Sequence, residues 1–261
     1  MAVNPSSWLG RRIRHRAAEQ WHLLAQRIQQ GDRRSARRLR DEAQALRQDL
    51  NLFLQGSDAQ TNAAGTSVQA LQMPPGTDWR WRPLIFQGAM QDSSMTAPDN
   101  GQRLGEEVAL WHDCANRSLI LRQKINRRAT DLAPYGLRLE GLGFSGSYLS
   151  LSLDLPEPAR EGLDGHHILR LAATLRAERP ITVYGRLNLA QGPNSETILR
   201  QLGDPVGGQR DERVVEFDLG YAELSDRPVD KLWLDLIFES PRMNAVTLSD
   251  MVMSRHARAS I

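Results

Sequence analysis

Cysteine is nearly absent from this sequence of 261 residues, in which Cys114 stands alone. A single cysteine forms no intrachain disulfide and supplies no cysteine-based zinc site, so the sequence predicts neither a metal nor a cofactor. Long apolar runs are missing too, and no stretch approaches the ~20 residues of a membrane span. Arg11, Arg12, Arg14 and Arg16 interrupt the apolar core that a secretory signal would need. We therefore expect a cytoplasmic protein of a reducing compartment.

Sequence motifs for catalysis are equally scarce. Gly141, Gly143 and Gly146 match the spacing of a dinucleotide-binding loop, but that loop requires a helix directly after the glycines. The residues from Ser147 to Leu155 alternate as a strand instead, so we interpret the glycines as a turn between strands. No GxSxG nucleophile elbow is present. The sequence therefore gives no positive sign of an enzyme.

His112, Asp113 and Cys114 are adjacent and suggest a thiol site. Neighbours in sequence are rarely catalytic partners in space, because partners usually come from distant parts of a chain. We interpret these three residues as structural.

Lysine is also rare, so arginine carries most of the positive charge. Residues 1–55 contain eleven arginines against five acidic residues, a net charge of +6, whereas the rest of the chain has a net charge of −4. The densest cluster consists of Arg33, Arg34, Arg37, Arg38 and Arg40. A helix with this cluster could bind an anion or a partner, although a solvated helix face is the favoured interpretation. A nucleic acid or an anionic membrane surface is disfavoured, because no helix-turn-helix, RNA-binding motif or aromatic platform accompanies the arginines.

Two amphipathic helices are predicted within residues 1–55. Asn4-Pro5 is typical of a helix start, and apolar residues then recur every three or four positions as far as Ile28. After Gly31-Asp32, a second apolar series follows the same spacing: Ala36, Leu39, Ala43, Leu46, Leu50 and Phe53. This narrow seam is typical of a helical hairpin or a coiled coil. It either packs within the chain or mediates self-association as a homo-oligomer.

Residues 56–77 are rich in Gly, Ser, Ala, Gln, Thr and Pro, and we interpret them as a linker. The next segment, residues 78–258, is predicted to be one domain with a mobile loop at about 88–105. The Gly192–Ser195 segment is predicted to be a turn, and Thr197 to Leu202 a short helix that Gly203 ends.

Apolar and polar residues alternate repeatedly between about Tyr135 and Ser254. The apolar members of these runs include Leu149, Leu151, Leu153, Leu169, Leu171, Leu187, Leu189, Phe217, Leu232, Leu234, Leu236, Val246 and Leu248. Because side chains on a strand point to opposite faces with a period of two, each run predicts a strand with one buried face. The predicted fold is mainly β, an antiparallel β-sandwich or jelly roll preceded by an N-terminal α-helical hairpin.

The strand phases also give a candidate ligand-binding face. The polar residues that alternate with buried ones on three predicted strands are Arg186, Asn188, Glu216, Asp218, Trp233 and Asp235. If those strands share a sheet, one outer face combines a tryptophan with planar polar side chains. Sugars bind to such faces, because an aromatic ring stacks on the sugar's C–H face while polar groups pair with its hydroxyls. The alternative is an ordinary solvent face. Paired carboxylates are also typical of glycoside hydrolases. We disfavour that activity, because outward-facing acidic residues are common on protein surfaces.

Several short segments of the sequence are distinctive: Trp79-Arg80-Trp81-Arg82-Pro83, Phe144-Ser145-Gly146-Ser147-Tyr148, Arg186-Leu187-Asn188, Gly192-Pro193-Asn194, Val215-Glu216-Phe217-Asp218-Leu219 and Met243-Asn244. In these segments the chain resembles a family of alphaproteobacterial proteins of unknown function. The resemblance covers most of residues 78–258 and implies no activity and no site residues. The strand pattern is also similar to the galactose-binding-type jelly rolls of carbohydrate-binding modules, a likeness of architecture that does not by itself fix function.

We therefore expect a non-catalytic binding module for a carbohydrate or another polyhydroxylated ligand. The competing hypothesis is a structural or assembly protein that uses its N-terminal helices for self-association or partner docking.

Overall fold

The computed structural model divides the chain into two compact units, Met1–Leu54 and Gln55–Ile261. It describes residues 7–29, 39–40, 42–43, 45–47, 49–50, 53, 67–90, 92–225 and 227–258.

The first unit contains helix α1, Trp8–Gln29. Ser7 precedes the helix, and its hydroxyl accepts a hydrogen bond from the Gly10 N–H at 3.1 Å, as expected of an N-cap. The predicted start at Asn4-Pro5 lies outside the described residues. None of the helices in the described part of the chain combines the length and apolarity that crossing a bilayer requires.

The second predicted helix falls largely outside the described residues. Those that are described between Leu39 and Phe53 are helical, and the seam positions Leu46, Leu50 and Phe53 are exposed. Packing of these three side chains within the chain is therefore not observed.

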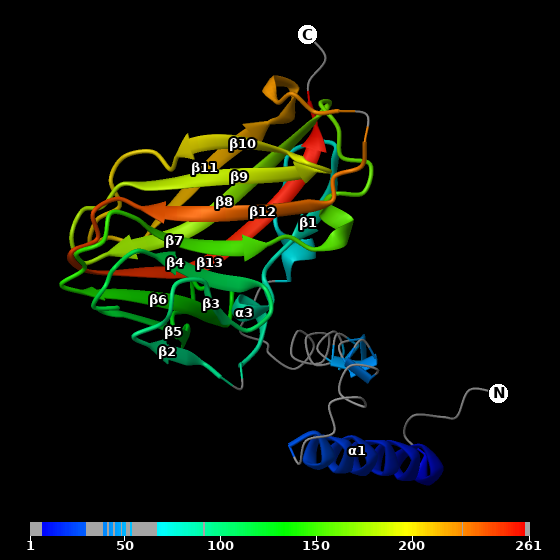
Figure 1. Cartoon of the computed structure of the whole chain (residues 1–261). Helices are drawn as coiled ribbons and strands as arrows, with labels where there is room; N and C mark the ends of the chain where they lie inside the picture. Colours follow the sequence, from blue (N-terminus) through cyan, green and yellow to red (C-terminus); the bar gives the residue numbers. More distant parts are fainter. Residues whose placement is uncertain are drawn as a thin grey trace. The chain divides into compact units, whose positions relative to one another are not determined.

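The second unit is a sandwich of two antiparallel sheets (Figure 1). The seven-stranded sheet has the order β11 (Asp211–Asp218), β8 (His167–Ala177), β13 (Met243–Ala257), β6 (Tyr135–Leu142), β5 (Leu119–Ile125) and β2 (Ser94–Thr96), and β1 (Thr77–Trp81) pairs with β13. The six-stranded sheet has the order β10 (Asn194–Gln201), β9 (Val183–Gln191), β12 (Lys231–Phe238), β7 (Leu149–Asp154), β4 (Val108–His112) and β3 (Gln102–Leu104). Short helical turns are η1 (Val68–Ala70), α3 (Leu84–Gln87), η2 (Glu157–Ala159) and η3 (Leu219–Tyr221). The fold class predicted from the alternating runs, a mainly β sandwich, is confirmed.

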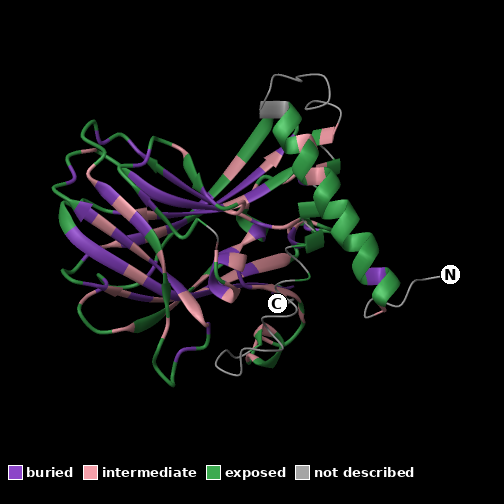
Figure 2. Cartoon of the chain, turned by 90° about the horizontal axis from the view of Figure 1, so that it is seen from below, coloured by how far each residue is buried: buried purple, intermediate pink, exposed green. Residues whose placement is uncertain are grey.

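The core lies between the two sheets, and buried residues run along the strands of both (Figure 2). On β7, Leu149, Leu151 and Leu153 are at most 2% exposed. The predicted apolar residues of β8, β9 and β12 are buried as well. Period-two alternation therefore gives the buried face correctly, because the pleat sends successive side chains to opposite sides.

Residues 77–90 join β1 to the sheet through β13 and place Ile85 and Phe86 in the core. Trp79 and Trp81 stack with their ring centroids 6.3 Å apart. Arg82 is buried, and its Nε and Nη2 each donate to a different carboxylate oxygen of Asp250 at 2.8 Å. This bidentate ion pair joins the end of β1 to β13.

One expectation about local structure requires correction. Thr197 to Leu202 form no helix, because Asn194–Gln201 pairs with β9 throughout its length as β10. Gly192, with φ of +60°, turns the chain into this hairpin, and the ladder of backbone hydrogen bonds overrides the local helical pattern. The polar stretch 88–105 contains the edge strands β2 and β3; its mobility stays a prediction.

Candidate functional site

The outer face of the six-stranded sheet contains a hollow of about 320 Å³. We call it the aromatic hollow, and its lining residues are Arg103, Ala109, Trp111, Tyr148, Ser150, Ser152, Asp154, Arg186, Lys231, Trp233 and Asp235. They come from strands β3, β4, β7, β9 and β12 and from the residue before β7.

Small side chains on central strands form the floor of the aromatic hollow. In the register of the sheet, Ser152 lies between Ala109 of β4 and Asp235 of β12. Ser150 is one pleat further along β7, opposite Trp111. On β7 the leucines thus face the core, while the serines face the hollow. The floor is open because these serines and Ala109 leave space that larger side chains would fill.

Aromatic rings flank this floor. Trp111 and Tyr148 are 45% and 40% exposed, so both rings are open to solvent. Trp233 is half-buried, and the Lys231 ammonium lies 5.0 Å from the centroid of its ring, a cation–π distance.

Asp113 fixes the segment that carries Tyr148. Its Oδ1 accepts hydrogen bonds from the backbone N–H of Ser147 at 2.7 Å and of Tyr148 at 3.1 Å, and its Oδ2 accepts one from the Ser147 hydroxyl at 2.5 Å. The Ser147 hydroxyl and these N–H groups stabilise the charged carboxylate and lower the pKa of Asp113. A Cβ at Gly146 would lie 2.3 Å from Asp113 Oδ1. The requirement for glycine at this position is therefore steric.

A polar network lies beneath the Trp233 side of the hollow. Asp235 Oδ2 accepts hydrogen bonds from Arg186 Nη2 and from Asn188 Nδ2, both at 2.9 Å. Both donors are on β9, where Arg186 is opposite Asp235 and Asn188 is opposite Trp233. Asp235 Oδ1 has no partner among the described residues, so one carboxylate oxygen stays available.

Ser150 adds a buried hydroxyl to the floor of the aromatic hollow. The residue is 5% exposed, and its Oγ has no hydrogen-bond partner among the described residues. Leaving a buried hydroxyl without a partner costs about 1–3 kcal/mol, and such groups require an explanation such as a bound molecule or water.

Asp154 lies at the rim of the hollow. It forms ion pairs with Arg103 Nη2 at 2.8 Å and with Lys231 Nζ at 3.4 Å. The rim therefore carries two cations around a shared carboxylate.

The structure brings together three of the six predicted ligand-binding residues: Trp233, Asp235 and Arg186. Asn188 is adjacent, but it is only 2% exposed and its amide is used in the network beneath the hollow. We therefore assign it a positioning role. The expectation that all three strands share a sheet is wrong. Glu216 and Asp218 lie on β11 of the other sheet, where Asp218 pairs with Arg258 at 3.1 Å.

The residues that sequence reasoning missed are Arg103, Ala109, Trp111, Tyr148, Ser150, Ser152, Asp154 and Lys231. Ser150, Ser152 and Asp154 are visible in the sequence as the outward members of an alternating strand. Their proximity to Trp233 depends on the pairing of β7 with β12, which no local pattern reveals.

The arginine cluster of the first unit is not assembled into a described site. Arg33, Arg34, Arg37 and Arg38 lie outside the described residues, and Arg40 is helical and exposed. Its role in binding an anion or a partner stays a prediction.

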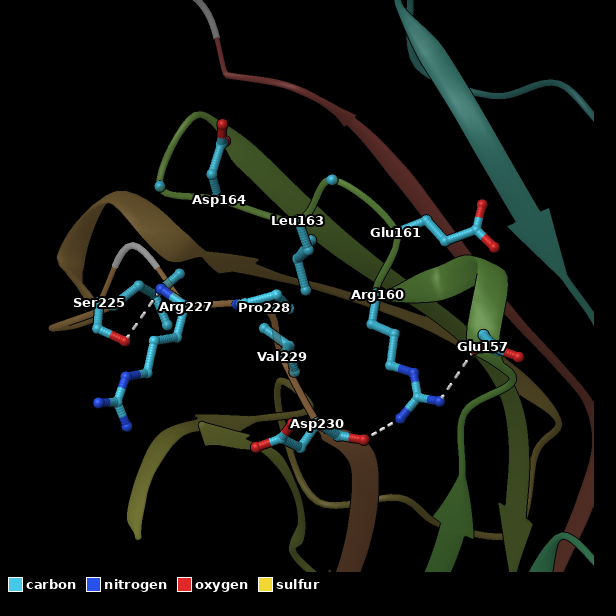
Figure 3. Close-up of a pocket in the computed structure, with 13 residues that line it drawn as sticks. Glu157, Arg160, Glu161, Leu163, Asp164, Ser225, Arg227, Pro228, Val229 and Asp230 are labelled. Carbon is cyan, nitrogen blue, oxygen red and sulfur yellow. Dashed lines mark hydrogen bonds and ion pairs between the residues drawn. The ribbon is translucent and has the colours of Figure 1, made fainter. Parts of the chain in front are cut away.

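A larger hollow, of about 780 Å³, lies between residues 157–165 and 224–230 (Figure 3). Arg160 crosses it, donating to the Asp230 carbonyl and lying 3.6 Å from the Glu157 carboxylate. The Asp230 carboxylate in turn accepts the Gly192 N–H at 2.6 Å. The polar groups of this larger hollow are used to connect loops of the protein to each other. We therefore favour the aromatic hollow as the ligand site.

Glu107, directly before β4, makes the stability of the sandwich depend on pH. Its Oε2 accepts the Leu84 N–H at 2.6 Å, yet burial, with the charges of Glu106 and Asp154, raises the pKa of Glu107 to about 8. The folded state keeps this proton at pH values where the unfolded chain has lost it. The resulting stabilisation is complete below about pH 4.5, the usual pKa of a glutamate, and is lost as the pH rises to about 8.

We therefore expect the free energy of unfolding to fall by about 2 kcal/mol between pH 6 and pH 9, measured by urea denaturation. Glu107→Gln, which keeps an acceptor for Leu84, is expected to remove most of this dependence, whereas Glu106→Gln is expected to retain it. An unchanged pH dependence in Glu107→Gln would contradict the assignment.

Across the described ranges, no three side chains of the His, Cys, Asp or Glu type are grouped so as to hold a metal ion.

The fold and the aromatic hollow together define a jelly-roll β-sandwich with a concave outer sheet face, preceded by a separate helical unit. The chain belongs to a family of unknown function, DUF6478, whose family model matches residues 1–261. No curated protein matches its sequence.

Solved structures give distant similarities. The xylan-binding domain CBM22-1 from Paenibacillus barcinonensis is 12% identical, with a TM-score of 0.38 over 66% of this chain and 100% of that one. A family 11 carbohydrate-binding module from Clostridium thermocellum, in complex with a mixed-linked tetrasaccharide, is 10% identical, with a TM-score of 0.39 over 65% and 97%. The enzymatically active domain of tailspike protein 4 from bacteriophage CBA120 is 7% identical, with a TM-score of 0.43 over 60% of this chain. The match spans only 21% of the tailspike chain.

Proposed function

We propose that this protein is a non-catalytic module that binds a carbohydrate or another polyhydroxylated ligand in the aromatic hollow. The observation that carries the proposal is a hollow that combines the exposed rings of Trp111 and Tyr148 with a polar lining. A sugar suits both features, because it offers an apolar C–H face to the rings and hydroxyls to the polar side chains.

The two tryptophans suggest a ligand longer than one sugar ring. Trp111 of β4 is opposite Ser150 of β7, and Trp233 of β12 is opposite Asp154 of β7. The two tryptophans are therefore two strands apart across the sheet and four residues apart along it. Standard strand spacings place their Cα atoms roughly 16 Å apart. Since Lys231 covers one face of the Trp233 ring, stacking is left to the opposite face. An oligosaccharide that lies diagonally across β4, β7 and β12 would contact both rings.

The carboxylates favour binding over hydrolysis. Glycoside hydrolysis requires one carboxyl group to be protonated as a general acid while a second acts as base or nucleophile. Here Asp154 is paired with Arg103 and Lys231, and Asp235 with Arg186. Both acids of the hollow are thus held by cations, an arrangement suited to orienting ligand hydroxyls.

The direct test is a glycan array of the full chain, followed by calorimetry with the best ligands. Each polar pair with a sugar replaces a bond to water, so the expected affinity is modest. We expect a Kd on the order of millimolar to micromolar, roughly 4–8 kcal/mol, with oligosaccharides preferred over their monosaccharides. Absence of binding to every glycan at millimolar concentration would refute the proposal.

Self-association through the N-terminal seam is the second candidate function, because Leu46, Leu50 and Phe53 are exposed at helical spacing. We expect Leu46→Asp to reduce the oligomer mass in analytical ultracentrifugation, since a charge in an apolar contact is strongly unfavourable. Leu199→Asp, which places the same charge on an exposed sandwich position, is the control. A wild-type protein that sediments as a monomer at high concentration would exclude this candidate.

A further inference from the structure

The outer face of the seven-stranded sheet contains a further hollow, of about 670 Å³, whose charged lining residues are mainly cations. We call it the basic hollow. Its charged lining residues are Lys124, Arg127, Arg128, Arg176, Arg210 and Asp131. It is on the opposite sheet from the aromatic hollow, and the proposed function does not use it.

The loop that carries Arg127 and Arg128 is held in place by hydrogen bonds. Asn126 Nδ2 donates to three carbonyl oxygens, those of Ala133, Tyr135 and Ser249, at 2.8–2.9 Å. Asp131 Oδ2 accepts the Arg128 N–H at 2.8 Å. The backbone beneath the cations is therefore ordered before any ligand arrives, which reduces the entropic cost of binding.

Asp131, the acid among the lining residues, is already engaged, because it is paired with Arg210. Outside the lining, Glu140 of β6 and Glu178, which directly follows β8, are paired with Arg122 and Arg138 at 2.7–3.0 Å.

Four cations of the hollow have no carboxylate partner within the described part of the chain: Lys124, Arg127, Arg128 and Arg176. Arg176 is the most informative of them, because it is half-buried on β8. Thr247 is beside it in the register, and Arg138 lies beyond Thr247 on the next strand. Arg138 is balanced by its own carboxylate partners. Arg176 is therefore a partly desolvated guanidinium without an ion pair in the described part of the chain, which is unfavourable unless an anion joins it.

We propose that the basic hollow binds a small polyanion that carries two or more phosphate-type groups. Guanidinium groups pair with phosphate oxygens in a planar, two-pronged geometry, and the volume is that of a small-molecule site. A small ligand is favoured over a nucleic acid or a membrane, because the cations line a concavity. The chain beyond residue 55 has a net charge of −4, so the positive charge is local.

Calorimetry of the full chain with inorganic tripolyphosphate, at fixed ionic strength, tests this site. Orthophosphate serves as the single-group comparison, and we expect tripolyphosphate to bind at least tenfold more tightly. Arg176→Gln and Arg127→Gln are each expected to weaken tripolyphosphate binding tenfold or more. Arg200→Gln removes the same charge from an exposed position on β10 and is expected to change the affinity less than twofold.

Several results would overturn the proposal. One is equal weakening by Arg200→Gln, which would show that bulk charge alone attracts the anion. Another is unchanged binding in both hollow variants. Tighter binding of duplex DNA or of anionic phospholipid vesicles through the same arginines would replace the small polyanion with a polymer or a membrane. A lowered unfolding midpoint in Arg176→Gln would make its binding result a consequence of lost stability. In that case Arg127→Gln tests the site, because Arg127 lies on an exposed loop.

Discussion

Replacing Trp233 with alanine is expected to remove detectable oligosaccharide binding while leaving the sandwich folded. Trp233 projects outward from β12, whose inward residues Leu232, Leu234 and Leu236 are the ones in the core. Loss of its contact with an apolar sugar face should weaken binding by about 2 kcal/mol, roughly thirtyfold. For a ligand whose wild-type Kd is close to millimolar, that places the affinity beyond calorimetric measurement. Calorimetry with the best glycan of the wild-type protein gives the comparison.

The matched control is Tyr221→Ala, which removes an aromatic side chain that is 77% exposed and lies outside the hollow. It is expected to bind like the wild type, and Trp233→Phe is expected to retain part of the affinity because a ring remains. If Trp233→Ala unfolds, the ring has a core role. If it binds unchanged, the ligand lies elsewhere, and assembly becomes the leading function.

The largest effect on stability is expected from Asp250→Ala. Asp250 and Arg82 are both 4% exposed and form two hydrogen bonds of 2.8 Å. Removing the carboxylate takes one side out of a buried, bidentate ion pair, which costs about 3–5 kcal/mol. We expect urea denaturation to show this loss.

A double variant distinguishes a lost ion pair from a general packing defect. Arg82→Met combined with Asp250→Leu removes both charges and keeps apolar volume, and it is expected to recover most of the lost stability, since hydrophobic replacements of buried pairs are often neutral or better. A double variant as unstable as Asp250→Ala would contradict an electrostatic cause. The exposed pair of Arg117 and Asp99, with an N–O distance of 2.5 Å, is the surface control: Asp99→Ala should cost at most about 1 kcal/mol.

Local sequence pattern was sufficient for the fold class and for the phase of most strands. The leucines of β7 and β12 alternate with polar residues, and the pleat converts that period directly into a buried and an outer face. The short helix expected at 197–202 was wrong because pairing with β9, a tertiary interaction, decided the conformation.

The candidate site was only partly predictable, because it depends on strand order. Trp233, Asp235 and Arg186 were found together since β9 and β12 happen to be neighbours. Glu216 was placed with them wrongly, because nothing in its own segment tells which sheet β11 joins. Asn188 was correctly placed on the outer side of its strand, yet its amide is buried in hydrogen bonds that only the neighbouring strand supplies. Trp111 and Ser150 are also brought to Trp233 by non-local pairing.

The most direct measurement is a crystal structure of the full chain with the best oligosaccharide from the array. We expect sugar density in the aromatic hollow, with one ring stacked on the Trp233 face opposite Lys231. Its hydroxyls should lie about 2.7–3.0 Å from Ser150 Oγ and Asp235 Oδ1. Density for the oligosaccharide at another surface, with Ser150 Oγ still unpartnered or bonded to water alone, would contradict the proposed binding site.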